Sequence, residues 1–402
     1  MVPGRGPATT YDTGSPCHLT SPRGRSAARA LAPAGFVRAP TYTLTPVQAV
    51  VLVGGEGTRL RPLTLETPKP MVPIMNMPFL ERTLRRIKEA GIDDVILPAG
   101  YLPDAITSYF GDGSRLGLRL RYVIEDTPLG TAGALKNVEQ FIDGPFFVLN
   151  GDVLTSLDLR AMLDYHRRKG GIGTLHLIHV DDPSAFGAVV HDADGRIEAF
   201  VEKPPRDQAP TNEINAGTYL LEREVLARIP AGRPVSIERE TFPELIRSGD
   251  RPLYAFTTDD YWIDLGKPEA YLSAHRHVFD GSMPLGLTPE IDGPGRETIP
   301  ASAVRPPVFV GLDCHIAPDA VIGPYAVLGD GCTVESGAVV ADSLLWDGVT
   351  VERNAQVDWA IVASRARIGA GARVGHGAVI GHDAAIPAGA LVEENARVAA
   401  ER

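Results

Sequence analysis

The sequence predicts an α/β protein in which a domain with a mixed, mostly parallel sheet is followed by a parallel β-helix. Two observations predict this fold. From residue 47 to about residue 278, short apolar segments alternate with amphipathic helical segments, as in a sheet covered by helices on both sides. From residue 316 onward, aliphatic residues recur every six positions, a period typical of a parallel β-helix. We place the two domains at 46–280 and 308–402, joined by a Gly- and Pro-rich linker at 281–307.

The first domain is predicted to begin with a buried strand of four apolar residues, 50–53, which runs directly into a glycine-rich turn. Residues 173–222 contain four further strand-like segments, which we interpret as a sheet that walls a pocket. The other expected elements are helices at 78–90, 157–169, 236–247 and 268–278 and strands at 94–99, 118–124, 145–149 and 253–257.

The second domain is recognised by the residues that are expected to face the inside of its coil. Small residues, mostly alanine, follow most of the aliphatic positions by four places and leave room for the next corner of the coil. The aliphatic positions are Ile316, Ile322, Leu328, Val334, Val340, Leu345, Val351, Val357, Val362, Ile368, Val374, Ile380, Ile386, Val392 and Val398. Because an open-ended coil exposes strand edges, we expect this domain to mediate homo-oligomerisation.

Composition excludes several function classes. The chain has 402 residues and a formal net charge of −11, so we expect no nucleic-acid partner. No apolar run approaches the roughly 18 residues of a membrane span, so we expect no membrane partner either. Three scattered cysteines form neither a disulfide framework nor a zinc-ligand spacing, which favours a location in the reducing cytoplasm. Residues 1–45, rich in Arg, Pro, Gly and Ser, are expected to form a disordered arm.

The glycine-rich turn GGEGT at 54–58 is suited to binding a polyphosphate. Glycines allow backbone N–H groups to approach a phosphate, and Arg59, Arg61 and Lys69 add cations nearby. The turn is not a Walker loop, which would need Gly-Lys-Ser/Thr, and Leu60 stands where a dinucleotide loop needs its third glycine. Asp152 follows another strand, so both features are expected at the carboxyl edge of the sheet, where ligands bind.

Seven motifs occur in an order that resembles the nucleoside-diphosphate-sugar pyrophosphorylases, or sugar-1-phosphate nucleotidylyltransferases. They are GGEGTRLRPLT, PKPMVP, LNGD, FVEKP, NAG, SIERETFP and WIDLGKPEAY, which begin at residues 54, 68, 149, 200, 215, 236 and 262. The nearest branch is mannose-1-phosphate guanylyltransferase, and the resemblance covers residues 47–402. It implies a Rossmann-like nucleotidyltransferase domain and a left-handed β-helix. It also implies transfer of a nucleotidyl group from a nucleoside triphosphate to a sugar 1-phosphate, with release of pyrophosphate.

Such a reaction brings two anionic reactants together, so catalysis is mainly alignment and neutralisation of charge. The attacking phosphate is largely ionised at pH 7, because its second pKa is about 6, and no histidine base is required. Asp152 and Asp264 are our candidate ligands for Mg²⁺, which is commonly held by one or two carboxylates and by substrate phosphates. Arg59 and Lys69 are expected to bind the triphosphate and offset charge on pyrophosphate.

The resemblance also implies two sets of binding residues. The nucleotide is expected to contact Leu52, Gly54, Gly55, Gly57, Thr58, Glu125, Gly130, Asn150 and Gly151. The sugar phosphate is expected to contact Gly187, Glu202, Lys203 and Asn215.

Guanine is the base we expect, so GTP is favoured. An ionised carboxylate at Glu125 only accepts hydrogen bonds, and guanine offers it both N1–H and an exocyclic amine. Uracil and thymine offer one ring N–H between two carbonyls, which suits an amide better. Uridylyl or thymidylyl transfer to glucose 1-phosphate remains the alternative.

Two other classes stay open on sequence alone. Hexapeptide coils can present a histidine to an acyl group, and His315, His376 and His382 are available for an acyltransferase. A non-catalytic regulatory homologue is the second class, although the five positions expected to carry charge in the reaction are all present. These positions are Arg59, Lys69, Asp152, Lys203 and Asp264.

Overall fold

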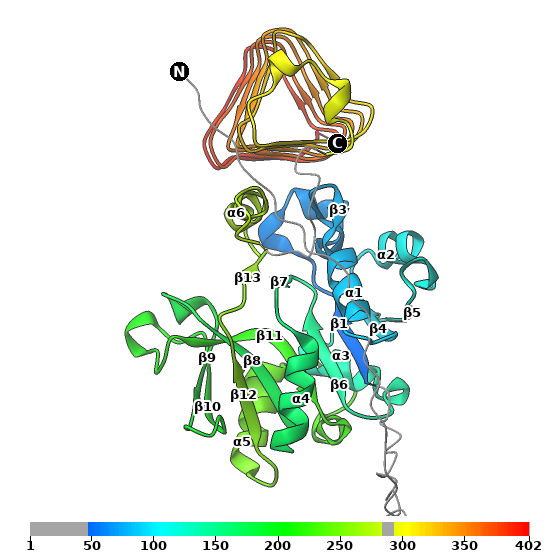
Figure 1. Ribbon diagram of the computed structural model, residues 1–402, viewed down its shortest axis with the longest axis vertical. Helices are drawn as coiled ribbons and strands as arrows, with labels where there is room; N and C mark the ends of the chain where they lie inside the picture. Colours follow the sequence, from blue (N-terminus) through cyan, green and yellow to red (C-terminus); the bar gives the residue numbers. More distant parts are fainter. Residues whose placement is uncertain (1–46, 284–292, 402) are drawn as a thin grey trace, which may run out of the picture. The chain divides into compact units, whose positions relative to one another are not determined.

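The computed structural model describes residues 47–283 and 293–401. The expected N-terminal arm and part of the expected linker lie outside these residues. The first domain is built on one nine-stranded sheet (Figure 1). Seven strands follow the order β10-β9-β11-β6-β1-β4-β5, and β8 pairs with both β11 and β12. The strands are β1 (Gln48–Leu52), β4 (Asp94–Ala99), β5 (Arg119–Ile124), β6 (Phe146–Asn150), β8 (Gly173–His179), β9 (Gly187–His191), β10 (Ile197–Glu202), β11 (Glu213–Leu221) and β12 (Leu253–Thr257).

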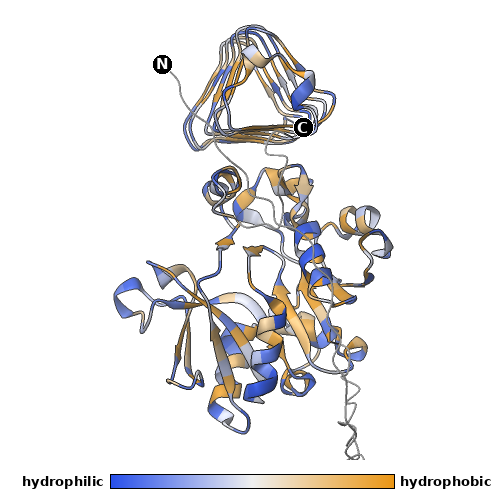
Figure 2. Ribbon diagram, in the orientation of Figure 1, coloured by the Kyte–Doolittle hydropathy of each residue, from blue (hydrophilic) through white to orange (hydrophobic). Residues whose placement is uncertain are grey.

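The centre of the sheet is parallel and apolar. β1 pairs in parallel with β4 and with β6, in a register that puts Leu52 opposite Asn150. Val50 and Val51 are fully buried, as expected for a strand covered on both faces, and Figure 2 shows the apolar character of these strands. Because β1 and β6 run in the same direction, the glycine-rich turn and Asp152 leave the sheet at the same edge.

The other half of the sheet is mostly antiparallel, with the parallel pair β12 and β8 as the exception. β11 runs antiparallel to β6, β8 and β9, and β9 pairs with β10 as a hairpin. These strands correspond to the four segments that the sequence predicted between residues 173 and 222. The sheet is therefore mixed, as expected.

Helices pack beside the strands that precede or follow them. The expected helices all form, the third of them as a π turn at Ile237–Thr241 followed by α5. Two helices were not predicted, α2 and α3, because neither has a long apolar stripe. The helices are α1 (Phe79–Glu89), α2 (Pro103–Phe110), α3 (Gly130–Asn137), α4 (Leu159–Lys169), α5 (Phe242–Ser248) and α6 (Pro268–Phe279). No helix in the described part of the chain is long and apolar enough to cross a membrane.

The second domain is a three-sided coil of very short parallel strands, seen end-on in Figure 1. Its three sheets contain six, five and five strands. Predicted aliphatic positions stack in register, as where Val334 pairs with Val351 and Val351 with Ile368. The strands are β14 (Val308–Val310), β15 (His315–Ile316), β16 (Val321–Ile322), β17 (Ala326–Leu328), β18 (Thr333–Val334), β19 (Val339–Ala341), β20 (Leu344–Leu345), β21 (Thr350–Val351), β22 (Gln356–Asp358), β23 (Ile361–Val362), β24 (Arg367–Ile368), β25 (Arg373–Val374), β26 (Val379–Ile380), β27 (Ala385–Ile386), β28 (Leu391–Val392) and β29 (Arg397–Val398).

Side chains of the coil contact the segment that follows the glycine-rich turn. The indole N–H of Trp346 donates to the Tyr271 hydroxyl at 3.1 Å, and this hydroxyl donates to the carbonyl of Pro73 at 2.5 Å. The Nε2 of His382 lies 3.1 Å from the carbonyl of Leu63 and 3.2 Å from the hydroxyl of Thr67. The β-helix therefore supports the segment that carries Arg59 and Lys69.

Candidate active site

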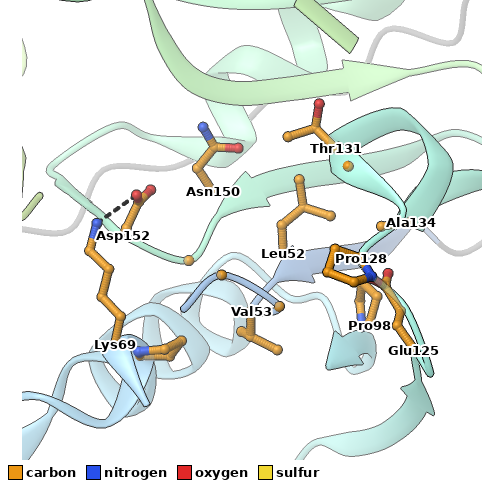
Figure 3. A pocket seen from close by; sticks show the side chains of 15 residues that line it. Leu52, Val53, Lys69, Pro98, Glu125, Pro128, Thr131, Ala134, Asn150 and Asp152 are labelled. Carbon is orange, nitrogen blue, oxygen red and sulfur yellow. Dashed lines mark hydrogen bonds and ion pairs between the residues drawn. The ribbon is translucent and has the colours of Figure 1, made fainter. Parts of the chain in front are cut away.

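A cavity of about 290 Å³ lies at the carboxyl edge of β1 and β6. Figure 3 shows Lys69 and Asp152 at one end of it and Glu125 at the other, with Asn150 and Leu52 between them. Its walls are formed by Leu52, Val53, Gly54, Gly55, Lys69, Pro70, Pro98, Glu125, Pro128, Gly130, Thr131, Ala134, Asn150, Gly151 and Asp152. One end thus carries the opposite charges of Lys69 and Asp152, whereas the other end is formed by prolines and the single carboxylate of Glu125.

Two pairs of opposite charges lie together at the charged end, where Lys69 and Asp152 line the cavity and Arg59 and Asp264 do not. The ammonium of Lys69 lies 2.7 Å from Asp152 and 3.8 Å from Asp264, and Arg59 lies 4.0 Å from Asp264. Two short antiparallel strands, β7 (Val153–Thr155) and β13 (Trp262–Asp264), bring the aspartates together by pairing Asp264 with Val153. All four residues that the sequence singled out for catalysis are therefore close together.

Asp264 is the more perturbed carboxylate. Burial raises its pKa, the negative charge of Asp152 raises it further, and Lys69 and Arg59 oppose the rise. Among the described residues, its Oδ1 has no hydrogen-bond partner. An oxygen of this kind, buried beside another carboxylate, is suited to a cation.

The donor set fits a hard divalent cation held partly by its substrates. In the described part of the chain, no group of three or more His, Cys, Asp or Glu could hold a metal, which leaves the pair Asp152 and Asp264 as the candidate ligands. Two carboxylates are enough when phosphate oxygens and water complete the shell. When bound, such a cation would neutralise phosphate charge, while Arg59 and Lys69 orient the same phosphates.

The glycines of the turn differ in their roles. Gly54 and Gly55 line the cavity, whereas Gly57 and Thr58 do not. Gly57 has a φ of 63° and precedes a 3-10 turn at Thr58–Leu60, so it shapes the backbone that presents Arg59. A Cβ on Gly151 would lie 2.3 Å from the carbonyl of Leu52, so only glycine allows the two strand ends to approach.

Glu125 forms the other end of the cavity. One of its oxygens accepts a hydrogen bond from the Leu129 amide at 3.4 Å, and the other, buried, has no partner among the described residues. Burial raises the pKa of Glu125, and the Leu129 amide opposes the rise. Gly130 lines the cavity beside it with a φ of 70°, and a Cβ there would lie 2.7 Å from the carbonyl of Val235.

The residues expected to bind the sugar phosphate lie on neighbouring strands. Glu202 pairs with Gly187 across β10 and β9, and Lys203 lies 3.6 Å from Glu202. Lys203 has a φ of 52°, a conformation that costs a non-glycine residue energy and that clusters at functional sites. Burial raises the pKa of Glu202, and Lys203 opposes the rise.

Asn215 has its polar atoms occupied by the protein. Its amide donates to the Tyr219 hydroxyl at 2.8 Å, and its oxygen accepts from the Gly217 amide at 3.1 Å. It therefore holds the NAG turn in place. None of these four residues lines the 290 Å³ cavity; three of them meet where β9 pairs with β10, and Asn215 lies on β11, which pairs with β9.

Sequence reasoning missed Thr131, Pro98 and Pro128. Thr131 lines the cavity, donates to Glu238 at 2.9 Å and accepts from the Ile237 amide at 2.8 Å, which ties α3 to the π turn. Thr131 and Pro128 lie close in sequence to Glu125 and Gly130, which were expected to contact the nucleotide, so the sequence contained a local signal. Pro98 follows no motif, and only the strand order places it here.

The β-helix histidines do not form an acyl-transfer site. His382 is buried and bonded to Leu63 and Thr67, as described above, and the ring of His376 stacks on Trp359 at 5.2 Å. His315 is exposed on β15. Among the described residues, the charged side chains that were expected to act in catalysis lie close together in the first domain.

The fold and the site together define a nucleotide-binding transferase. Two family models match the chain, "Nucleotidyl transferase" at residues 48–281 and "GMPPB C-terminal domain" at 304–400. The chain belongs to the nucleotidyl transferase family, and it is an enzyme of the nucleotidyltransferase class. The expected α/β nucleotidyltransferase fold followed by a β-helix of parallel strands is confirmed.

Two named relatives and one solved structure show which proteins this chain is similar to. The chain is 42% identical over 313 residues to "Mannose-1-phosphate guanylyltransferase" of Mycobacterium tuberculosis, covering 78% of this chain and 83% of that protein. It is 34% identical over 342 residues to "UTP--glucose-1-phosphate uridylyltransferase" of Synechocystis, covering 81% and 85%. Among solved structures, HddC from Yersinia pseudotuberculosis has a TM-score of 0.50 and 32% identity, over 57% of this chain and 97% of that one.

Proposed function

We propose that this enzyme transfers a guanylyl group from GTP to mannose 1-phosphate, forming GDP-mannose and releasing pyrophosphate. The observation that carries the choice of GTP is the half-buried Glu125 carboxylate at the end of the cavity opposite Lys69 and Asp152, where one of its oxygens is buried and has no partner among the described residues. The relative from Mycobacterium tuberculosis, named for this reaction, supports the proposal.

The base would be held in a fixed direction. With Lys69 and Asp152 at one end of the cavity, the triphosphate extends toward them and the base toward Glu125 (Figure 3). Guanine can then donate from N1–H and from its amine to the two carboxylate oxygens. Uracil or thymine would place a carbonyl against one of these oxygens, which is repulsive.

Mg²⁺ is the cation we propose for Asp152 and Asp264. It is usually held by one or two carboxylates together with substrate phosphates, and this matches the donors that the protein supplies. Arg59 and Lys69 would stabilise the departing pyrophosphate, because both lie beside the aspartates.

The sugar phosphate would bind at the wall formed by β9, β10 and β11. Lys203 is exposed there and can bind the phosphate, Glu202 can accept hydrogen bonds from sugar hydroxyls, and the Gly187 backbone faces them. We further infer that the protein acts in the cytoplasm and forms homo-oligomers through the β-helix. The absence of a membrane-spanning helix among the described residues agrees with the first inference.

A substrate matrix tests the proposal. GTP, UTP, dTTP and ATP are each combined with mannose, glucose and fucose 1-phosphates and Mg²⁺, and pyrophosphate is measured. We expect the highest kcat/KM for GTP with mannose 1-phosphate. An optimum for UTP or dTTP with glucose 1-phosphate would replace this function with the alternative, which the Synechocystis relative represents. Absence of pyrophosphate with every pair would indicate a regulatory homologue.

A further inference from the structure

A second cavity of about 270 Å³ lies next to the first. One wall is the face of α1 that carries Arg82, Arg85, Arg86 and Glu89, and the opposite wall includes Asn150 at the end of β6. Asn150 also lines the first cavity, so the two cavities share a wall. Three arginines against one glutamate give the second cavity a positive charge.

Arg82 is the unusual residue of this cavity. Its side chain is only 5% exposed, and its Nη2 donates to the carbonyl of Ile74. Its Nε and Nη1 have no hydrogen-bond partner anywhere in the described chain. A buried guanidinium with two unpartnered nitrogens is costly, because desolvation of an ion costs several kcal/mol unless another group compensates it.

The adjacent carboxylate does not fully compensate this charge. Glu81 is almost fully buried, and its two oxygens accept from Arg85, Arg115 and the Tyr109 hydroxyl at 2.5 to 3.0 Å. Burial lowers the pKa of Arg82 to about 10, and the negative charge of Glu81 opposes this fall only in part. No described residue supplies the missing partner, and Arg82 lines a cavity that an anion or water can enter.

Arg86 supplies a second cation on the same helix face, one turn further on. It lines the cavity, one of its nitrogens donates to the carbonyl of Leu157 at 2.5 Å, and burial lowers its pKa. Two guanidinium groups one turn apart match the several acceptor oxygens of a phosphate, which arginine binds with paired N–H donors.

We propose that the second cavity is an oxyanion site in which Arg82 and Arg86 hold a phosphate group. The site is separate from the triphosphate end of the first cavity, which uses Lys69 and Arg59. The phosphate is either free or carried by a small ester, and the experiment below distinguishes these two sources. Since Asn150 separates the two cavities, an occupant would contact the strand end that leads to Asp152.

Thermal unfolding of the full-length protein tests the site without depending on transfer activity. The first cavity is saturated with GTP, and 10 mM inorganic phosphate, 10 mM glycerol phosphate or sodium chloride at the same ionic strength is added. We expect phosphate to raise the Tm of the wild type by about 2 °C or more, with chloride giving no such rise. A larger rise with glycerol phosphate than with phosphate would identify the ester as the ligand.

Matched variants distinguish a specific phosphate site from nonspecific attraction of phosphate by nearby positive charge. Arg82→Met should abolish the rise, whereas Arg85→Met, which removes an arginine already paired with Glu81, should keep most of it. Arg86→Met serves as the second test if Arg82→Met does not fold. No rise in the wild type, an equal rise in Arg82→Met, or equal losses in Arg82→Met and Arg85→Met would overturn the proposal. Failure of guanylyl transfer would leave each of these results unchanged.

Discussion

The ammonium nitrogen of Lys69 lies between two carboxylates, 2.7 Å from Asp152 and 3.8 Å from Asp264. This position offsets the repulsion between the aspartates. Lys69 is also well buried, with 11% of its side chain exposed, so its interactions are screened less than those of a surface lysine. The charged end of the cavity is therefore arranged before any substrate binds.

Arg59→Ala is expected to lower turnover by about 100-fold or more, the usual effect of removing a donor that stabilises developing charge. Its side chain is 59% exposed and makes one distant ion pair, so the free energy of unfolding should change by no more than about 0.5 kcal/mol. Steady-state kinetics and urea unfolding measure the two effects. The control is Arg61→Ala, since Arg61 pairs with Glu56 at 2.8 Å and, among the described residues, with neither Asp152 nor Asp264. Near-normal turnover in Arg59→Ala would make the turn a structural feature only.

Asp264→Asn is expected to raise the Mg²⁺ concentration for half-maximal velocity by about 10-fold or more, because it removes one of two carboxylate ligands. Titrating Mg²⁺ at saturating substrates measures this effect. Asp260→Asn is the control, since Asp260 accepts a hydrogen bond from Ser156 at 3.0 Å instead of facing Lys69. An unchanged Mg²⁺ requirement in Asp264→Asn would remove Asp264 from the metal site.

Glu125→Gln is expected to reduce the preference for GTP over UTP by about 10-fold, because the amide presents a donor to guanine where two acceptors are needed. The ratio of kcat/KM values measures the preference. Asp126→Asn changes an exposed neighbour that does not line the cavity and should leave the ratio unchanged. Selectivity that survives in Glu125→Gln would place base recognition elsewhere.

The raised pKa of Glu125 predicts that the affinity for GTP depends on pH. Burial raises the pKa of Glu125, so acidification protonates it earlier than an exposed glutamate and removes an acceptor for guanine. The affinity of the wild type for GTP should therefore fall as the pH is lowered through this raised pKa. The affinity of Glu125→Gln should vary less over the same range.

His275 links protein stability to pH. It is buried, its Nδ1–H donates to the carbonyl of Tyr271 at 3.0 Å, and its Nε2 accepts from the Met75 amide at 3.3 Å. Burial lowers its pKa to about 4, so from pH 6.5 down to 4 the unfolded chain binds a proton that the folded protein does not. Stability should fall across this window by about 3 kcal/mol from this group. Urea unfolding at several pH values should show a weaker dependence for His275→Gln, and an equal dependence would exclude His275 as the cause.

The fold was largely predictable because its two periodic signals are strong. The hexapeptide period identified the inward side chains of the coil, such as Val334 and Ile368, which are buried as expected. Apolar segments gave the central strands, and parallel pairing of β1 with β6 follows from their alternation with helices. Helix α3 was missed because its small residues, from Gly130 to Ala134, give no amphipathic pattern.

The site was only partly predictable, since its geometry depends on contacts between distant segments. Asp264 reaches Asp152 through β7 and β13, which are three residues long and too short for any periodic signal. The motif around Asn215 predicted a sugar ligand, but its hydrogen bonds to Tyr219 and Gly217 appear only in three dimensions. Arg82 looked like an ordinary helix cation until its burial was known.

Pyrophosphate release by Asp152→Asn tests the central claim most directly, because Asp152 is the partner of Lys69 and a metal ligand in the proposed reaction. With GTP, mannose 1-phosphate and Mg²⁺, the wild type should release one pyrophosphate for each GDP-mannose formed. Asp152→Asn should bind GTP, but its rate of pyrophosphate release should be lower than that of the wild type by a factor of about 100 or more. A variant as fast as the wild type would contradict the assignment of this cavity as the site of nucleotidyl transfer.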